Sequence, residues 1–262
     1  EGWANALPAA DQGAVGAAPG PDATALERCL QREAGRAWGA LARVRDDLDA
    51  VVRYARGELR GTNDLRALTG AFGRGQVPAA WRGMLPGDAN SLMVDAWVGD
   101  LGARVAAAEA YGPVLRREAG AEDGGGPDYW LGGMFAPEGF LTATRQAAAE
   151  ANDWSLEDLE LHLDTDGGGS GGVGVRGLVL QSAGLAPDGT HVVLEGPPKS
   201  ALPPSRLRWA PRGGAFGERL RLPLYAGASR TTLLAEVIVA KAPGVKAEMW
   251  AQRGAALLAW DA

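Results

Sequence analysis

The chain has 262 residues, enough to bury a core, and its formal charge of −6 and pI near 5.1 argue against a general nucleic-acid binder. The single cysteine, Cys29, excludes an intrachain disulfide and a four-thiolate metal site, and indicates a reducing compartment. No stretch reaches the roughly 20 apolar residues of a membrane helix, so neither nucleic acid nor a membrane is an expected partner. The start at Glu1 rather than Met leads us to expect a fragment.

A long amphipathic helix is the first element that the sequence predicts, after an irregular lead-in over residues 1–21 that is rich in Ala, Gly and Pro. Thr24 and Glu27 have the spacing of a capping box, and the helix is expected to run to about Leu59. Packing within a larger protein is favoured over a coiled coil, because Ala occupies three of the eight seam positions. The seam is Leu30, Ala34, Ala37, Leu41, Val44, Leu48, Val51 and Ala55.

Shorter helices are expected in the next hundred residues. Gly61 can end the long helix, and a short helix follows around Leu65 and Leu68. Another is predicted from Ser91 to Tyr111, and a third begins near Pro137 after an acidic, glycine-rich loop over residues 118–128. The first part of the sequence is therefore predicted to be helical.

Beyond about Glu157 the apolar period changes to two. Leu159, Leu161 and Leu163 alternate with charged or polar residues, as in a half-buried strand. Further short strands, separated by Gly, Pro and Asp, predict a small sandwich or barrel. The predicted strands are Val173–Gln181, His191–Leu194, Leu207–Trp209, Leu220–Tyr225, Leu233–Ala240 and Ala255–Trp260.

Two glycine-rich patterns suggest chemistry but lack its structural setting. Gly172, Gly174 and Gly177 match the dinucleotide fingerprint, yet a helix must follow that loop, and GLVLQS predicts a strand. Gly168, Ser170 and Gly172 spell the nucleophile elbow, which requires a strand-to-helix turn that this glycine run does not predict.

The candidate bases and metal ligands are equally weak. His162 and His191 are the only histidines, and a strand-face or loop position is favoured for each over a rigid Ser–His pair. Asp164 and Asp166 begin like a calcium loop, but the twelfth position is Val175 rather than Glu.

An acidic group on the long helix, made by Asp46, Asp47 and Asp49, is interpreted as a solvated charged face among arginines. No GxxxxGK[ST] loop occurs in the sequence. We therefore expect no catalytic, cofactor-binding or metal-binding residue and no enzyme activity in this segment.

Four blocks in the second part of the sequence resemble the C-terminal region of dynein heavy chains, over most of residues 58–262. The family's "VP..W" and "W..DL..R" correspond to Val77, Pro78 and Trp81, and to Trp97, Asp100, Leu101 and Arg104. The most specific block, "FWLSGFFFPQAFLTGTLQ" with a downstream "IDxLxF", resembles residues 129–146 and 156–161. The family's "GVY..GL.L.GA" and "PK" resemble residues 172–184 and 198–199, and "HWI.RGVALLCQLD" resembles residues 249–261.

The sequence also departs from this family pattern in two places. The family's "SYPSLKPLGSW" is replaced with little identity between Leu85 and Trp97, and "LSTTGHSTNF" is reduced to Thr231–Leu234. Residues 1–57 match in character only. These departures indicate a divergent dynein, for which we expect an axonemal or flagellar type, while the cytoplasmic and intraflagellar types stay open.

The resemblance implies an α+β fold: a helical part with one long amphipathic helix, then a small C-terminal antiparallel β-barrel. It implies three segments: a lead-in and long helix over residues 1–57, at the end of the last AAA+ module or the start of the C-terminal domain, a helical subdomain over 58–157 and the barrel over 158–262. The parent would be an ATP-driven, minus-end-directed microtubule motor in the cytoplasm and cytoskeleton, in the cilium or axoneme. ATP and Mg²⁺ would bind in its AAA+ ring, and no cofactor would bind in this segment.

The role that the resemblance implies for this segment is a non-catalytic cap on the ring that modulates motility. The long helix and the cluster from Trp130 to Leu141 are expected to be its packing anchors, with many tryptophans facing the ring. The expected partners are the rest of the heavy chain, the microtubule through that polypeptide, and dynein intermediate and light chains. The alternative is a docking module for the intermediate and light chains that has no effect on the ring.

Overall fold

A computed structural model describes residues 2–3, 7–8, 20–86, 92–115, 126–165, 171–213 and 218–259. The protein is divided into two compact units. The first unit comprises Glu1–Ala18 and Leu30–Gly112, and the second comprises Pro19–Cys29 and Pro113–Ala262. The expected division at residues 57 and 157 into three segments stays a prediction. No helix in the described ranges has the length and apolar character needed to cross a membrane.

The first unit is helical, as predicted. Most of the long helix α2 (Ala25–Ala55) belongs to it, together with α3 (Asn63–Gly73), the 3₁₀ turn η2 (Ala79–Trp81) and α4 (Val94–Glu109). The predicted seam of α2 is confirmed from Leu30 to Leu48, where its members are buried. The helix ends four residues earlier than the predicted Leu59, because Gly57 adopts a left-handed φ of 78°.

Aromatic rings form the centre of the first unit. Trp81 stacks on Trp97 with ring centroids 5.1 Å apart, and Phe72 packs against Trp81 at 5.3 Å. Trp81 also donates its indole N–H to Asp47 at 2.9 Å. The two tryptophans of the family-like blocks are therefore core residues of this unit and are fully buried in it.

The start of α2, which lies in the second unit, has the predicted capping box. The Thr24 amide donates to Glu27 Oε2 at 2.6 Å, and the Glu27 amide donates to Thr24 Oγ1 at 3.1 Å. Two backbone amides that a helix start leaves unpaired are thus satisfied reciprocally.

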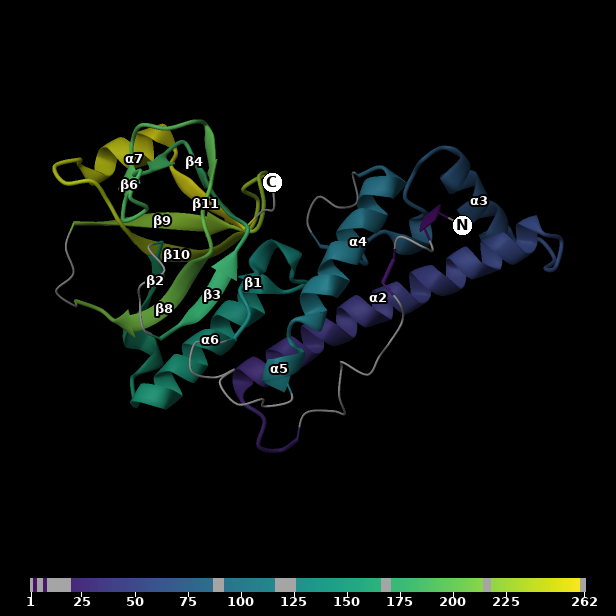
Figure 1. The fold of residues 1–262 in the computed structure, drawn as a ribbon, viewed down its shortest axis with the longest axis horizontal. Helices are drawn as coiled ribbons and strands as arrows, with labels where there is room; N and C mark the ends of the chain where they lie inside the picture. The colour runs from purple at the N-terminus through teal and green to yellow at the C-terminus, as the bar shows by residue number, and fades with distance from the viewer. Residues whose placement is uncertain are drawn as a thin grey trace. The chain divides into compact units, whose positions relative to one another are not determined.

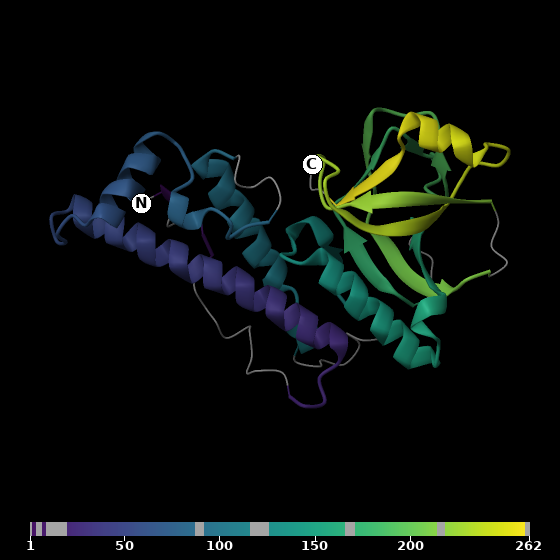
Figure 2. The same ribbon diagram turned by 180° about the vertical axis from the view of Figure 1, so that it is seen from behind.

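A large sheet with helices beside it forms the rest of the second unit (Figures 1 and 2). Helix α6 (Pro137–Asn152) lies along one side of the sheet, and α7 (Ala247–Arg253) lies on the opposite side. The smaller helical pieces are α5 (Gly112–Leu115), η4 (Leu131–Gly133) and η5 (Leu156–Asp158).

The long strand Arg219–Tyr225 alternates buried and more exposed residues, as the two-residue period predicts, whereas the short strands Leu178–Gln181 and Ala256–Ala259 are buried almost throughout. The strands are β1 (Tyr129–Trp130), β2 (Leu159–Asp164), β3 (Val173–Arg176), β4 (Leu178–Gln181), β5 (Gly184–Leu185), β6 (Val192–Val193), β7 (Lys199–Ala201), β8 (Ser205–Pro211), β9 (Arg219–Tyr225), β10 (Leu233–Ala240) and β11 (Ala256–Ala259). The main sheet has the order β1-β3-β8-β2-β10-β9-β11-β4-β7, and β5 pairs with β6 separately.

The α+β class is confirmed, but the expected purely antiparallel sheet is wrong. Three neighbouring pairs are parallel: β1 with β3, β2 with β10, and β9 with β11. The sequence alternation that predicts a strand is the same for both directions, so it could not reveal this. Closure into a barrel stays a prediction, because the strand order within the described ranges runs from β1 to β7 without a pairing between them.

The cluster from Trp130 to Leu141 packs inside the second unit. Trp130, Leu131, Met134, Phe140 and Leu141 are buried. A side chain at Gly133 would meet the Trp130 indole, and one at Gly177 would lie 2.7 Å from Trp130 Cδ1. The apolar surface of these side chains is therefore used in the protein's own core, and the expected role of the cluster as a packing anchor on the ring stays a prediction.

Several elements differ from the sequence prediction for local reasons. The predicted strand Val173–Gln181 is divided at Gly177, which has a left-handed φ of 70°. The predicted strand His191–Leu194 is reduced to Val192–Val193. Helix α7 was not predicted, nor were the two-residue β1 and the three-residue β7, which are too short to show a period.

Candidate functional site

Helix α6 positions one wall of an open groove in the second unit. Pro137 occupies the first turn of the helix, where its missing N–H costs nothing, and Asp153 ends the helix with a left-handed φ of 54°. The short η5 then leads directly into β2, so the backbone returns along the sheet. The Trp209 indole of β8 donates to Thr144 Oγ1 at 3.0 Å and attaches the helix to the sheet.

The groove has a volume of about 370 Å³. Apolar side chains supply much of its lining, and charged side chains come from α6, from β2, β9 and β10, and from Arg212 just after β8. The lining residues are Glu138, Leu141, Thr142, Arg145, Leu159, Glu160, Leu161, Trp209, Arg212, Arg221, Leu234, Ala235, Glu236 and Ile238.

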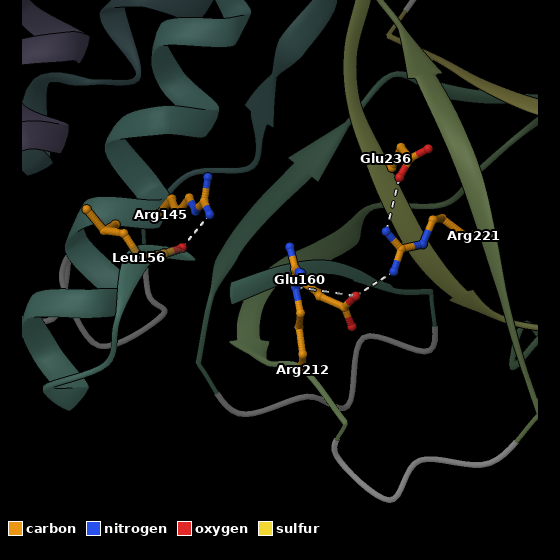
Figure 3. Close-up of polar contacts among 6 residues, drawn as sticks. All are labelled: Arg145, Leu156, Glu160, Arg212, Arg221 and Glu236. Carbon is orange, nitrogen blue, oxygen red and sulfur yellow. Dashed lines mark hydrogen bonds and ion pairs between the residues drawn. The ribbon is translucent and has the colours of Figure 1, made fainter. Parts of the chain in front are cut away.

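Charged groups of the groove are paired with one another (Figure 3). Arg221 donates to Glu236 at 3.0 Å and to Glu160 at 2.5 Å, and Arg212 lies 4.0 Å from the same Glu160. The hydrogen bond to Glu236 is the main cause that raises the pKa of Arg221. Three glutamates and three arginines line the groove, so its charges balance.

Arg145 connects the groove to the segment that follows α6. Its guanidinium lies 5.3 Å from the centroid of the Trp209 ring, within cation–π range, and it donates to the Leu156 carbonyl (Figure 3). The Arg145 side chain therefore holds the start of η5 against the groove.

Exposed apolar side chains occur next to the groove. Leu156, which follows α6, is 42% exposed, and Trp154 is 36% exposed. Leu233, beside the groove residue Leu234, is 54% exposed. Apolar side chains together with balanced charges are a common composition of a protein–protein interface, so this groove suits a protein surface.

The two histidines lie where the sequence predicts, on a strand face and in a loop. His162 is on β2, buried, and its Nδ1 lies 2.6 Å from an Arg219 guanidinium nitrogen. Burial is the largest cause that lowers the pKa of His162 to about 4, and Arg219 and Arg208 lower it further. His191 contacts Thr190 Oγ1 at 2.8 Å, close to the start of β6.

The glycine-rich patterns are only partly within the described residues. Strand β4 follows Gly177, which confirms the predicted strand and differs from the helix that a dinucleotide loop requires. Ser170, Gly168 and Asp166 lie outside the described residues. Asp164 forms an ion pair with Arg208 at 3.3 Å on the sheet.

The acidic residues of α2 have different surroundings. Asp47 is paired with Arg43 at 3.1 Å and accepts the Trp81 indole, so it is partly buried rather than fully solvated. Asp49 lies 3.7 Å from Arg53, and Asp46 is exposed. Among the described residues, no group of three or more potential His, Cys, Asp or Glu ligands gathers around a point.

The groove residues were missed by the sequence analysis, although a signal was present. Glu160 alternates with leucines on β2, and Arg219 and Arg221 alternate with leucines on β9. Opposite charges on one face of two strands would have suggested contact only if the strand order had been known.

Comparisons with known proteins extend over nearly the whole sequence. Residues 2–259 match the family model for the C-terminal domain of the dynein heavy chain. The cytoplasmic dynein heavy chains of Drosophila melanogaster and Dictyostelium discoideum are 34% and 28% identical over 89% and 90% of this protein. The ciliary dynein beta chain of Heliocidaris crassispina is 32% identical over 46% of it. The sequence spans about 5% of the length of the two cytoplasmic relatives and 2% of the ciliary one.

Proposed function

Because this chain belongs to the family of C-terminal domains of dynein heavy chains, we propose that it is the C-terminal part of a microtubule motor, and that it acts there as a non-catalytic cap on the AAA+ ring. The parent motor would hydrolyse ATP with Mg²⁺ in other modules of its heavy chain. The observation that supports this role is the groove beside α6, with its apolar lining and balanced charges, and the exposed Trp154 and Leu156 in the segment after α6.

A cap can change motor activity only if it makes different contacts in different nucleotide states of the ring. The groove offers both kinds of contact that such a difference needs. Leu156 and Trp154 can bury apolar area, worth about 25 cal/mol per Å², and the Arg221 pairs with Glu160 and Glu236 can exchange partners. We propose that the groove is the surface through which the cap senses the ring.

The first test is a recombinant motor whose heavy chain bears Trp154→Ala with Leu156→Ala. We expect its run length or stall force to change, because both side chains are exposed in the segment that follows α6 and that Arg145 ties to the groove. Met249→Ala is the matched control, since Met249 is 48% exposed but lies on α7, away from the groove. Single-molecule motility that is the same for both variants and the wild type would contradict the proposal.

A deletion of residues 160–262 tests the cap role more coarsely. We expect altered run length or stall behaviour, because the deletion removes the sheet against which α6 packs. The alternative role as a docking module predicts unchanged motility and loss of intermediate or light chains from a pull-down. The two readouts therefore distinguish coupling to the ring from accessory-chain docking.

The relatives favour a cytoplasmic type over an axonemal one. We propose that the parent protein is of the cytoplasmic type. The two cytoplasmic relatives match about nine-tenths of this sequence, whereas the ciliary one matches less than half. The expected placement in a cilium or axoneme stays a prediction. Tagging the parent protein in a ciliated cell and imaging it would decide between the cell body and the axoneme.

A further inference from the structure

A short segment that precedes the long helix is attached to the helical first unit. Trp3 packs against Phe72 of α3 in a T-shaped arrangement, with ring centroids 5.0 Å apart, and donates its indole N–H to Asp95 in the first turn of α4. Four residues later, Leu7 is 4% exposed, and its amide donates to the Trp3 carbonyl at 3.3 Å. We call Trp3, Leu7 and Pro8 the Trp3 segment.

Arg45 of α2 holds the other end of this segment. Its guanidinium donates to the carbonyl of Leu7 at 2.9 Å and also to the carbonyl of Pro8. A carbonyl next to a buried side chain is shielded from water and needs a donor from the protein, and one arginine supplies that donor to both. The Trp3 segment therefore contacts each of the helices α2, α3 and α4 of the first unit.

The contact with Phe72 continues the aromatic centre of the first unit. Phe72 packs against Trp81, which stacks on Trp97, and both of these tryptophans are fully buried. The partly exposed Trp3 is thus the outer member of a row of four rings. A closely packed interior resists deformation, so a force on Trp3 either moves these rings together or breaks the contact.

The order of the two units along the sequence gives this attachment a consequence. The Trp3 segment belongs to the first unit, but Pro19–Cys29 belongs to the second unit, and α2 returns to the first unit only at Leu30. Through covalent bonds alone, a preceding polypeptide would reach the second unit before the first. The contacts of the Trp3 segment attach that polypeptide directly to the first unit instead.

We propose that the Trp3 segment is the site at which the preceding part of the heavy chain acts on the helical unit, so that a displacement of the ring also displaces α2, α3 and α4. This inference rests on the proposed function, because it requires that the AAA+ ring precede the segment in the parent protein. Few side chains hold the segment, and such regions open locally more readily than a core does. The attached and detached forms are the two states that a coupling of this kind needs.

The attachment can be measured by hydrogen exchange of the complete recombinant motor, with mass spectrometry of the peptide that contains residues 3–8. We expect Trp3→Ala with Leu7→Ala to make exchange in this peptide about 10-fold faster or more, because the two apolar contacts that hold it are lost. The matched control is Trp154→Ala with Leu156→Ala, which removes the same two residue types from exposed positions of the second unit. We expect the control to change the exchange rate less than about 2-fold.

Arg45→Met tests the same attachment without a change in the segment itself. Methionine keeps an apolar stem but cannot donate to the two carbonyls, so we expect exchange in the peptide of residues 3–8 to become about 3- to 10-fold faster. Arg53→Met is the matched control, because Arg53 is on the same helix and forms its ion pairs with Asp49 and Glu58. It should leave the exchange of this peptide at the rate of the wild type.

Single-molecule motility of the same motors tests whether the attachment transmits movement. We expect a loss of stall force in the Trp3/Leu7 and Arg45 variants and none in Arg53→Met. The inference is overturned if exchange is unchanged in the Trp3/Leu7 variant, or if exchange becomes faster while the stall force stays that of the wild type. Altered motility in the Trp154/Leu156 variant but not in the Trp3/Leu7 variant would overturn this inference alone, whereas unchanged motility in both would also overturn the cap function.

Discussion

His162 shows how a single strand position can make stability depend on pH. Its imidazole is 3% exposed, and its pKa is lowered to about 4, mainly by burial and then by Arg219 and Arg208. The unfolded protein binds a proton at this residue near pH 6.5, which the folded protein does not accept until about pH 4. The free energy of unfolding should therefore fall as the pH falls through this window, by at most about 3 kcal/mol.

Urea denaturation at pH values from 7.5 to 4.5 measures this effect. The variant His162→Gln cannot bind the proton, so its stability should depend less on pH in the same window. Carboxylates contribute equally to both proteins, and the difference between the two curves isolates the histidine. Parallel curves would show that His162 is not the responsible group.

Gly177 combines an unusual backbone with a close neighbour. It has a φ of 70°, and a Cβ there would lie 2.7 Å from Trp130 Cδ1. Gly171 has a φ of 84° but no atom within 4 Å of such a Cβ. We expect Gly171→Ala to cost about 1–2 kcal/mol from the backbone alone, and Gly177→Ala to cost about 1–3 kcal/mol more because it overpacks the core. Chemical denaturation of both variants gives the difference, and equal costs would mean that Trp130 adapts.

The capping box at the start of α2 stabilises a whole element, the long helix. Thr24→Ala removes the side-chain oxygen that accepts the Glu27 amide, and we expect a loss of about 1 kcal/mol of stability. Thr24→Ser keeps this oxygen and should be close to the wild type. Thermal denaturation of the two variants compares them, and an equal loss in both would exclude the cap as its cause.

Strand β2 lies inside the sheet, between β8 and β10, so its buried leucines should matter for stability. Leu161 is 2% exposed, and Leu161→Ala is expected to cost about 2–5 kcal/mol through the cavity it leaves. Leu156, five residues earlier, is 42% exposed, and Leu156→Ala should change stability by about 0.5 kcal/mol or less. Similar denaturation midpoints for the two variants would contradict the packing described for β2.

Elements with a clear local pattern could be predicted from the sequence, and the others could not. The α2 seam, the capping box, the start of α6 at Pro137 and the strands β2 and β10 each have a period or a capping residue of their own. Helix α7 and strands β1 and β7 are short and depend on their tertiary neighbours. The helices and long strands were therefore predictable, and the groove between α6 and the sheet was not.

At the scale of the whole molecule, strand order is the information that the sequence did not contain. The groove requires that β2 lie between β8 and β10, with β9 next to β10. Such pairings join residues far apart in the sequence, for which a single sequence has no local signal. The groove became visible only once the register placed Glu160 and Arg221 on one side.

Strand β11 should be essential for the integrity of the sheet, because it is hydrogen-bonded to β9 on one side and to β4 on the other. Deleting residues 256–259 should expose the facing edges of β4 and β9 and separate β4 and β7 from the remaining strands. Hydrogen exchange should then lose protection in β4 while β2 and β8 keep theirs. Unchanged protection in β4 would show that another segment replaces β11.

The inner position of β11 also affects how the protein can form during synthesis. The ribosome synthesises β4 and β9 well before residues 256–259. The edges of β4 and β9 that face β11 therefore stay unpaired until β11 emerges. Pairing between distant segments is slow, and unpaired edges are prone to aggregation in the meantime. A nascent polypeptide stalled before residue 256 should therefore recruit chaperones that the completed protein no longer needs.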